Sequence, residues 1–191
     1  MFSSCLTPLV RTRLILRTPR ASQGRPFSRC TPLLSQSTIP VQVTGTGTGT
    51  VQSVAVKDKP YTFQADTYTA LGGTDASPSP VAYALASLSS CNQVTGFVVA
   101  RDHGIRLGKW KIKVDGVLPT AVLVGGAKEG NPNWESVRLE VRVQTDLNAK
   151  GEEEEGRFRY FVDEVERRCP ITQLFKLSGV RFESVWVNEV L

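Results

Sequence analysis

Two cysteines in this 191-residue chain, Cys91 and Cys169, are the residues whose type and setting favour chemistry. Cys169 directly precedes Pro170 at a predicted helix start, where free backbone amides and the helix dipole favour a thiolate. Polar side chains that can hydrogen-bond a sulfur anion or a bound oxygen flank Cys91, namely Ser89, Ser90, Asn92 and Gln93. The pattern indicates either redox chemistry at two thiols or, as for most free cysteines, two small buried apolar side chains.

The remaining cysteines and the histidine do not suggest a second chemistry. Cys5 and Cys30 lie far from the other two cysteines, so the sequence has no C-x-x-C motif and no compact disulfide framework. The single histidine, His103, excludes a metal site built mainly from histidines, and we expect it to act as a cation at a helix end. Only Cys91 and Cys169 are expected to matter to the fold.

Cys91 lies at the middle of a helix that we predict between Ser79 and Gly104. Ser79 suits an N-cap, Pro80 suits the first turn, and Gly104 supplies a left-handed stop. This run carries no charge before Arg101, and its apolar residues are not confined to one stripe, so we expect the helix to be buried on most sides. Its many polar residues argue against a membrane span. A sheet or a partner subunit must therefore cover it.

Cys169 lies where a second predicted helix is interrupted. That helix begins in the acidic run 152–155 and has apolar residues at i, i+3, i+4 and i+7, namely Phe158, Phe161, Val162 and Val165. Pro170 breaks the pattern, which resumes until Gly179. Cys169 is therefore expected at a kink or at the mouth of a new short helix.

Alternating apolar and polar residues predict the strands. The Thr-Gly repeat at 44–50 favours a strand or the start of a hairpin over a phosphate-binding loop, because no helix begins behind it. Charged side chains alternate with apolar ones at 109–114 and 137–143, and we interpret the lysines and arginines among them as a solvated face rather than a phosphate-binding patch. The other predicted strands are 51–56, 61–65 and 180–187, and a turn is expected at Asp115-Gly116.

The N-terminal segment differs in composition from the rest of the chain. Residues 1–42 are rich in Arg, Ser, Thr and Pro and contain no acid, which favours a mitochondrial presequence and linker over an ordinary disordered tail. The sequence Arg25-Pro-Phe-Ser suits cleavage after Phe27, and residues 43–191 form the predicted domain. Six of the 23 basic residues are arginines between Arg11 and Arg29, which leaves 17 basic against 18 acidic residues. A net charge of −1 gives no reason to expect nucleic-acid binding.

Two motifs resemble the OsmC/Ohr family of thiol peroxidases, the osmotically inducible and organic hydroperoxide resistance proteins. The first runs from Gly73 through Pro80 to Cys91 and has the family's proline eleven positions before the cysteine. The second, Val165-Glu-Arg-Arg-Cys-Pro-Ile-Thr, has the family's charged helix that runs into Cys-Pro. The resemblance covers residues 43–190.

This resemblance implies an α+β fold in which antiparallel sheets wrap around two central helices, giving an intertwined homodimer. Cys91 would be the catalytic cysteine that attacks an organic hydroperoxide, and Cys169 the one that closes a disulfide with it. The reductant would be a dithiol or a lipoyl protein, and no metal, flavin or nucleotide would be needed. Neither nucleic acid nor a membrane is an expected partner.

One feature of the family is absent. Active members pair the first cysteine with an arginine from the N-terminal strands and a glutamate just after the proline. Here no arginine occurs between Arg29 and Arg101, and Val81 follows Pro80. Lys57 or Lys59 can supply only a point charge without the planar fork of arginine. The alternative prediction is therefore a non-catalytic binding or structural dimer.

Overall fold

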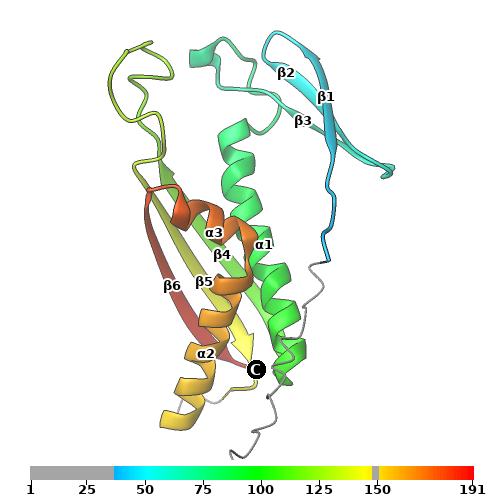
Figure 1. Ribbon diagram of the computed structural model, residues 1–191, viewed down its shortest axis with the longest axis vertical. Helices are drawn as coiled ribbons and strands as arrows, with labels where there is room; N and C mark the ends of the chain where they lie inside the picture. The colour runs from blue at the N-terminus through cyan, green and yellow to red at the C-terminus, as the bar shows by residue number, and fades with distance from the viewer. Residues whose placement is uncertain (1–36, 148–150) are drawn as a thin grey trace, which may run out of the picture. The chain divides into compact units, whose positions relative to one another are not determined.

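The computed structural model describes residues 37–147 and 151–191, and Pro40–Leu191 form a compact unit. Helices and two separate three-stranded sheets confirm the predicted α+β class. The predicted presequence cleavage site, Cys5 and Cys30 lie outside the described residues. Figure 1 shows the elements in chain order: β1 (Val43–Thr48), β2 (Val51–Val56), β3 (Thr62–Ala65), the 3-10 helix η1 (Thr69–Leu71), α1 (Pro80–His103), β4 (Leu107–Val117), β5 (Ser136–Thr145), α2 (Glu152–Arg168), α3 (Pro170–Leu177) and β6 (Arg181–Val190).

Helix α1 begins and ends where the sequence predicts. The Ser79 hydroxyl accepts a hydrogen bond from the Ala82 amide at 3.2 Å, and Gly104 ends the helix with a φ of 65°. The described chain by itself covers one face of α1 and leaves Val94 64% and Phe97 62% exposed. The buried face of α1 comprises Leu88, Asn92, Gly96, Val99 and Ala100.

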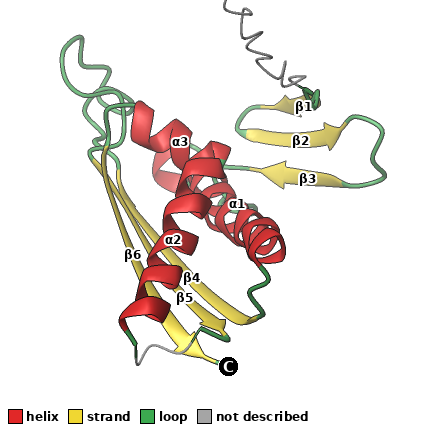
Figure 2. Cartoon of the chain, turned by 60° about the horizontal axis from the view of Figure 1, so that its bottom comes forward, coloured by secondary structure: helices red, strands yellow, loops and turns green. Residues whose placement is uncertain are grey.

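The second sheet has the order β4-β5-β6, and Figure 2 shows α1 and α2 over one face of it. Strands β4 and β5 are antiparallel, whereas β5 and β6 are parallel, which differs from the predicted antiparallel sheets. The reason is that α2 and α3 form the long crossover between β5 and β6 that a parallel pair requires. Strand β4 also continues through Asp115 and Gly116, where we expected a turn.

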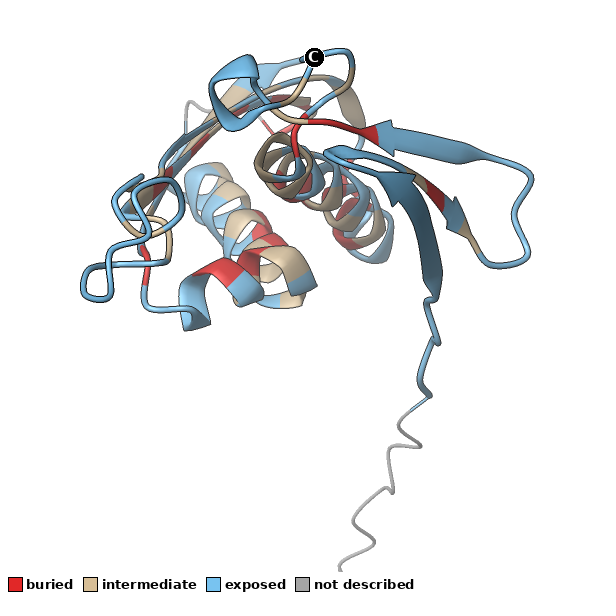
Figure 3. Ribbon diagram, turned by 90° about the horizontal axis from the view of Figure 1, so that it is seen from above, coloured by how far each residue is buried: buried red, intermediate tan, exposed pale blue. Residues whose placement is uncertain are grey.

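The main core lies between this sheet and the two long helices. Figure 3 shows that buried residues gather on the sheet and on the helix faces beside it. Trp110 and Trp186 pack against this core with their rings edge to face, which gives both a structural role. Its buried members are Val99, Ala100, Ile105, Leu139, Val141, Val143, Leu147, Phe161 and Val165.

The first sheet, β1-β2-β3, is antiparallel and largely exposed, with Val54 and Ala65 as its buried apolar residues. The Thr-Gly repeat is strand β1, as predicted. Its contact with the start of α1 runs through Tyr83, whose hydroxyl donates to the Gln64 carbonyl at 2.6 Å and whose ring lies 5.2 Å from that of Phe63. The sheet is therefore attached to the first turns of α1.

The loop between β3 and α1 is organised by a buried carboxylate, Asp66. It accepts hydrogen bonds from the Thr50 hydroxyl, from the backbone amide and hydroxyl of Thr74, and from the Ala76 amide. The Thr74 bond is the largest of the causes that hold the pKa of Asp66 well below its usual range. This carboxylate fixes the approach of the chain to α1.

Candidate active site

The local sequence around each cysteine sets its place in the fold. Cys91 is half-buried in the middle of α1, and Cys169 is fully buried at the junction of α2 and α3. Pro170 lacks an N–H and so begins α3, which makes Cys169 its N-cap. The Cys169 amide donates to the Val165 carbonyl, and its sulfur accepts from the Thr172 amide at 3.4 Å. The predicted helix mouth is confirmed.

The structure brings the two predicted site residues together. Cys91 and Cys169 are both free thiols, and the Cys169 side chain lies near enough to Cys91 to raise its pKa. The packing of α1 against α3 brings them near each other although many residues separate them in the sequence.

The Cys91 thiol is surrounded by neutral groups. Burial, and then the contact with Cys169, raise the pKa of Cys91 above its ordinary value. The Ile171 amide and the Thr95 hydroxyl act in the opposite direction, because hydrogen bonds to the sulfur favour its anion. The net effect favours the protonated thiol.

The polar residues beside Cys91 do not all have the predicted role. The Ser90 hydroxyl bonds carbonyls of its own helix, Gln93 is exposed, and Asn92 bonds Thr172. The hydroxyl that does lower the pKa of Cys91 belongs to Thr95, which we did not predict. The available signal was its spacing, because residues i and i+4 lie on one face of a helix.

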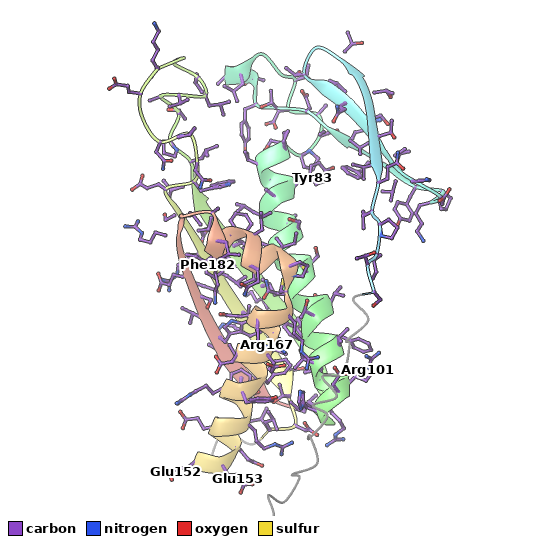
Figure 4. All side chains as sticks on the ribbon, in the orientation of Figure 1. Tyr83, Arg101, Glu152, Glu153, Arg167 and Phe182 are labelled. Carbon is purple, nitrogen blue, oxygen red and sulfur yellow. The ribbon has the colours of Figure 1, made fainter. Side chains whose placement is uncertain are left out.

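The basic residues available to the thiol do not replace the missing arginine. Arg101 is ten residues after Cys91, about 15 Å along the axis of α1. Figure 4 shows Tyr83 and Arg101 toward opposite ends of this helix, and Arg101 pairs with Asp102 at 3.2 Å. Lys57 and Lys59, the lysines considered as substitutes for the arginine, are exposed in the turn between β2 and β3.

A partly buried carboxylate one turn before Cys169, that of Glu166, anchors the junction of α2 and α3. Glu166 accepts hydrogen bonds from Lys176 in α3 and from Ser184 and Trp186 in β6. Burial tends to raise its pKa, but these donors outweigh burial and hold the pKa of Glu166 below its usual value. Glu166 therefore ties three elements together beside Cys169.

The lone histidine lies away from the thiols. His103 is in the last turn of α1, about 18 Å along the axis from Cys91, with its ring edge-on to Tyr160. It lines a hollow of about 300 Å³ together with Ile105, Glu153, Gly156, Arg157 and Tyr160. Within residues 37–147 and 151–191, no group of acidic, His and Cys side chains could hold a metal ion. No helix in this part of the chain is long and apolar enough to cross a membrane.

The family is decided by a direct match. A family model described as OsmC-like protein matches residues 73–184, which is more than half of the chain and includes both thiols. The chain belongs to the OsmC-like family. This confirms the resemblance inferred from the two cysteine motifs. No curated protein sequence matches the chain.

Solved structures of OsmC-like proteins share the fold at low identity. An OsmC-like protein from Mycoplasma pneumoniae is 17% identical, with 78% of this chain and 97% of that chain covered and a TM-score of 0.62. An organic hydroperoxide resistance protein from Elizabethkingia anophelis is 15% identical, with 81% and 99% covered and a TM-score of 0.58. One from Legionella pneumophila is also 15% identical, with 80% and 100% covered and a TM-score of 0.57. These likenesses establish the fold.

Proposed function

We propose that this chain is a thiol-dependent peroxidase that reduces organic hydroperoxides. The observation that carries the proposal is that two free thiols, Cys91 in α1 and Cys169 at the start of α3, lie near each other where these two helices pack together. Membership of the OsmC-like family supports it, as do similar structures named organic hydroperoxide resistance proteins. Cys91 is the more exposed of the two and is therefore assigned the first step.

The reaction uses two sulfur atoms in turn. The Cys91 thiolate attacks one peroxide oxygen, so that a sulfur–oxygen bond forms, the oxygen–oxygen bond breaks and the alcohol leaves with a proton. Cys91 is then a sulfenic acid. The Cys169 thiolate attacks the Cys91 sulfur, a disulfide forms, and hydroxide leaves and takes up the Cys169 proton as water. An external dithiol, such as a lipoyl protein, returns two electrons and two protons to the disulfide and becomes a disulfide itself.

A second candidate function is favoured by the neutral surroundings of Cys91. Burial raises the pKa of this thiol, and no cationic side chain is among the groups that shift its pKa. A chain that kept the scaffold and lost the activating arginine and glutamate would act as a non-catalytic binding or structural dimer. That candidate predicts slow thiols and no peroxide-dependent disulfide.

The active unit that we propose is a homodimer. Its support is the apolar surface that one chain leaves exposed on three elements, including Val94 and Phe97 on α1, Leu177 on α3, and Val51 and Phe63 in the first sheet. A second copy that covers these side chains would also close an apolar pocket for the hydroperoxide beside Cys91.

We also propose a mitochondrial location with residues 1–42 as presequence and linker. Its support is the arginine-rich, acid-free composition of this segment. A fluorescent fusion of the whole chain should enter mitochondria, and a fusion that begins at Val43 should not. Equal import of both fusions would contradict the proposal.

Intact-mass analysis tests the function. Treatment with one equivalent of an organic hydroperoxide should remove two hydrogen atoms, and peptide mapping should place the new bond between Cys91 and Cys169. In Cys169→Ser the intermediate should accumulate as a Cys91 sulfenic acid, which dimedone traps. A dithiol should restore the reduced mass and sustain peroxide consumption.

The controls separate the two candidate functions. Cys91→Ser should consume no hydroperoxide above the uncatalysed rate, so unchanged turnover in this variant would remove Cys91 from its assigned role. If the wild-type thiols resist stoichiometric hydroperoxide, the non-catalytic dimer is the better description.

A further inference from the structure

A buried hydrogen-bonded pair, Asn92 and Thr172, joins the two segments that carry the thiols. Asn92 follows Cys91 in α1, Thr172 is the third residue of α3, and both are 0% exposed. Asn92 Nδ2 donates to Thr172 Oγ1 at 3.0 Å, and the Thr172 hydroxyl donates in return to Asn92 Oδ1 at 3.3 Å. The steps of the peroxidase cycle use neither side chain.

Each member of the pair is also bonded to its own segment. Asn92 Nδ2 donates to the Leu88 carbonyl at 2.8 Å, within the turn of α1 that leads to Cys91. The Thr172 amide donates to the Cys169 sulfur, the cap of α3. A slide or rotation of α1 against α3 would therefore break this link and leave buried polar groups without partners.

We propose that Asn92 and Thr172 are positioning residues that hold the sulfurs of Cys91 and Cys169 in register for disulfide formation. Their bond fixes one residue next to each sulfur, so it restricts the distance and direction between the sulfurs. Bond formation between held groups is sensitive to displacements on the order of 1 Å, which can cost up to about a hundredfold in rate. This inference rests on the proposed function, because disulfide formation between these thiols is a step of the peroxidase cycle.

A merely structural pair would stabilise the chain without changing how well the thiols meet. The effective concentration of one thiol toward the other distinguishes the structural role from the positioning role. It is measured in buffers of reduced and oxidised glutathione. One oxidised glutathione takes two electrons and two protons from Cys91 and Cys169, giving two reduced glutathione molecules and one protein disulfide. Peptide mapping measures the fraction of this disulfide at each buffer ratio.

The main variant is Thr172→Val, which removes the hydroxyl at constant shape. We expect it to lower the effective concentration at least about tenfold. Thr172→Ser keeps the hydroxyl and should stay within about threefold of wild type. Thr145→Val is the matched control, because Thr145 is also 0% exposed and lies at the end of β5, away from the thiols. Its hydroxyl donates to Asn188 Oδ1 and accepts from the Leu147 amide. This variant too should stay within about threefold, since a lost buried hydrogen bond elsewhere leaves the sulfurs in place.

Two results would overturn the inference: a Thr172→Val value within threefold of wild type, or an equal loss in Thr145→Val. If Thr172→Val does not fold, the double variant Asn92→Leu/Thr172→Val replaces both partners by apolar groups and leaves neither unpaired. It should show the same tenfold loss, and a wild-type value in this variant would again contradict the inference.

The glutathione measurement also keeps this inference separate from the proposed function. A wild-type chain that forms the disulfide with glutathione but not with hydroperoxide would defeat the peroxidase proposal and leave the positioning role intact. A Thr172→Val chain that turns over peroxide and keeps the wild-type effective concentration would defeat the positioning role and leave the peroxidase proposal intact.

Discussion

At the scale of single residues, the chemistry of this site depends on how the Cys91 thiol ionises. Its neighbours are a second thiol, a backbone amide and a hydroxyl, and burial is the largest influence on its pKa. Without a cation beside it, the thiolate is a minor species at neutral pH, because an ordinary thiol already has a pKa of about 8.5. The pH dependence of Cys91 reactivity is therefore the most direct test of the site.

We predict that the rate of Cys91 alkylation by iodoacetamide rises about tenfold per pH unit between pH 7 and 9. The sign follows from the raised pKa, because below it each unit of pH increases the thiolate fraction about tenfold. Mass mapping measures the rate at Cys91 alone. A rate that is already constant at pH 7 would reveal an activating charge and contradict this account.

The variant Cys169→Ala serves as a control for the cause of the shift. The Cys169 thiol raises the pKa of Cys91 by its hydrogen bond and by charge repulsion, so its removal should move the alkylation profile toward lower pH. An unmoved profile would assign the whole shift to burial.

At the scale of elements, α1 lies against β4 at a place where only a glycine fits. A Cβ atom on Gly96 would lie 2.5 Å from the tip of the Trp110 ring. That ring is held between Phe161 and Trp186 and cannot move away freely. Gly96 therefore sets how closely the helix of Cys91 approaches the sheet.

We predict that Gly96→Ala lowers the free energy of unfolding by about 1–2 kcal/mol, because overpacking outweighs the gain in helix propensity. Gly156→Ala is the matched control, since Gly156 lies inside α2 with no atom within 4 Å of an added Cβ. It should raise the same free energy by about 0.5–1 kcal/mol. Urea unfolding measures both, and a stabilising Gly96→Ala would show that Trp110 yields easily.

At the scale of the whole molecule, the exposed apolar side chains of α1 are the feature that a single chain leaves unexplained. Val94 and Phe97 lie on the face of α1 opposite to Asn92 and Gly96, and both are mostly exposed. Large exposed apolar patches mark interaction surfaces, and the proposed homodimer would bury this one.

We predict that Phe97→Glu converts the proposed homodimer to monomers, because a charge on this face would have to be buried without a partner. Lys111→Glu also introduces an acidic side chain, but on the exposed face of β4, and should remain dimeric. Sedimentation velocity measures both. A monomeric wild-type chain, or an unchanged Phe97→Glu dimer, would contradict the assignment of this surface.

The sequence by itself determined the local structure around the two thiols. Caps, prolines and apolar periodicity act between residues a few positions apart, so Ser79, Gly104 and Pro170 were sufficient to predict where α1 and α3 begin or end. The two cysteine motifs were likewise sufficient for the family.

Only the tertiary structure decided which groups touch the sulfurs and how the strands pair. The proximity of Cys91 to Cys169, the bond between Asn92 and Thr172 and the parallel pairing of β5 with β6 all join segments far apart in the chain. Such contacts depend on how whole elements pack, and no local pattern encodes them. Thr95 is the exception, because it lies four residues after Cys91 on the same helix and its spacing was a local signal that the sequence already held.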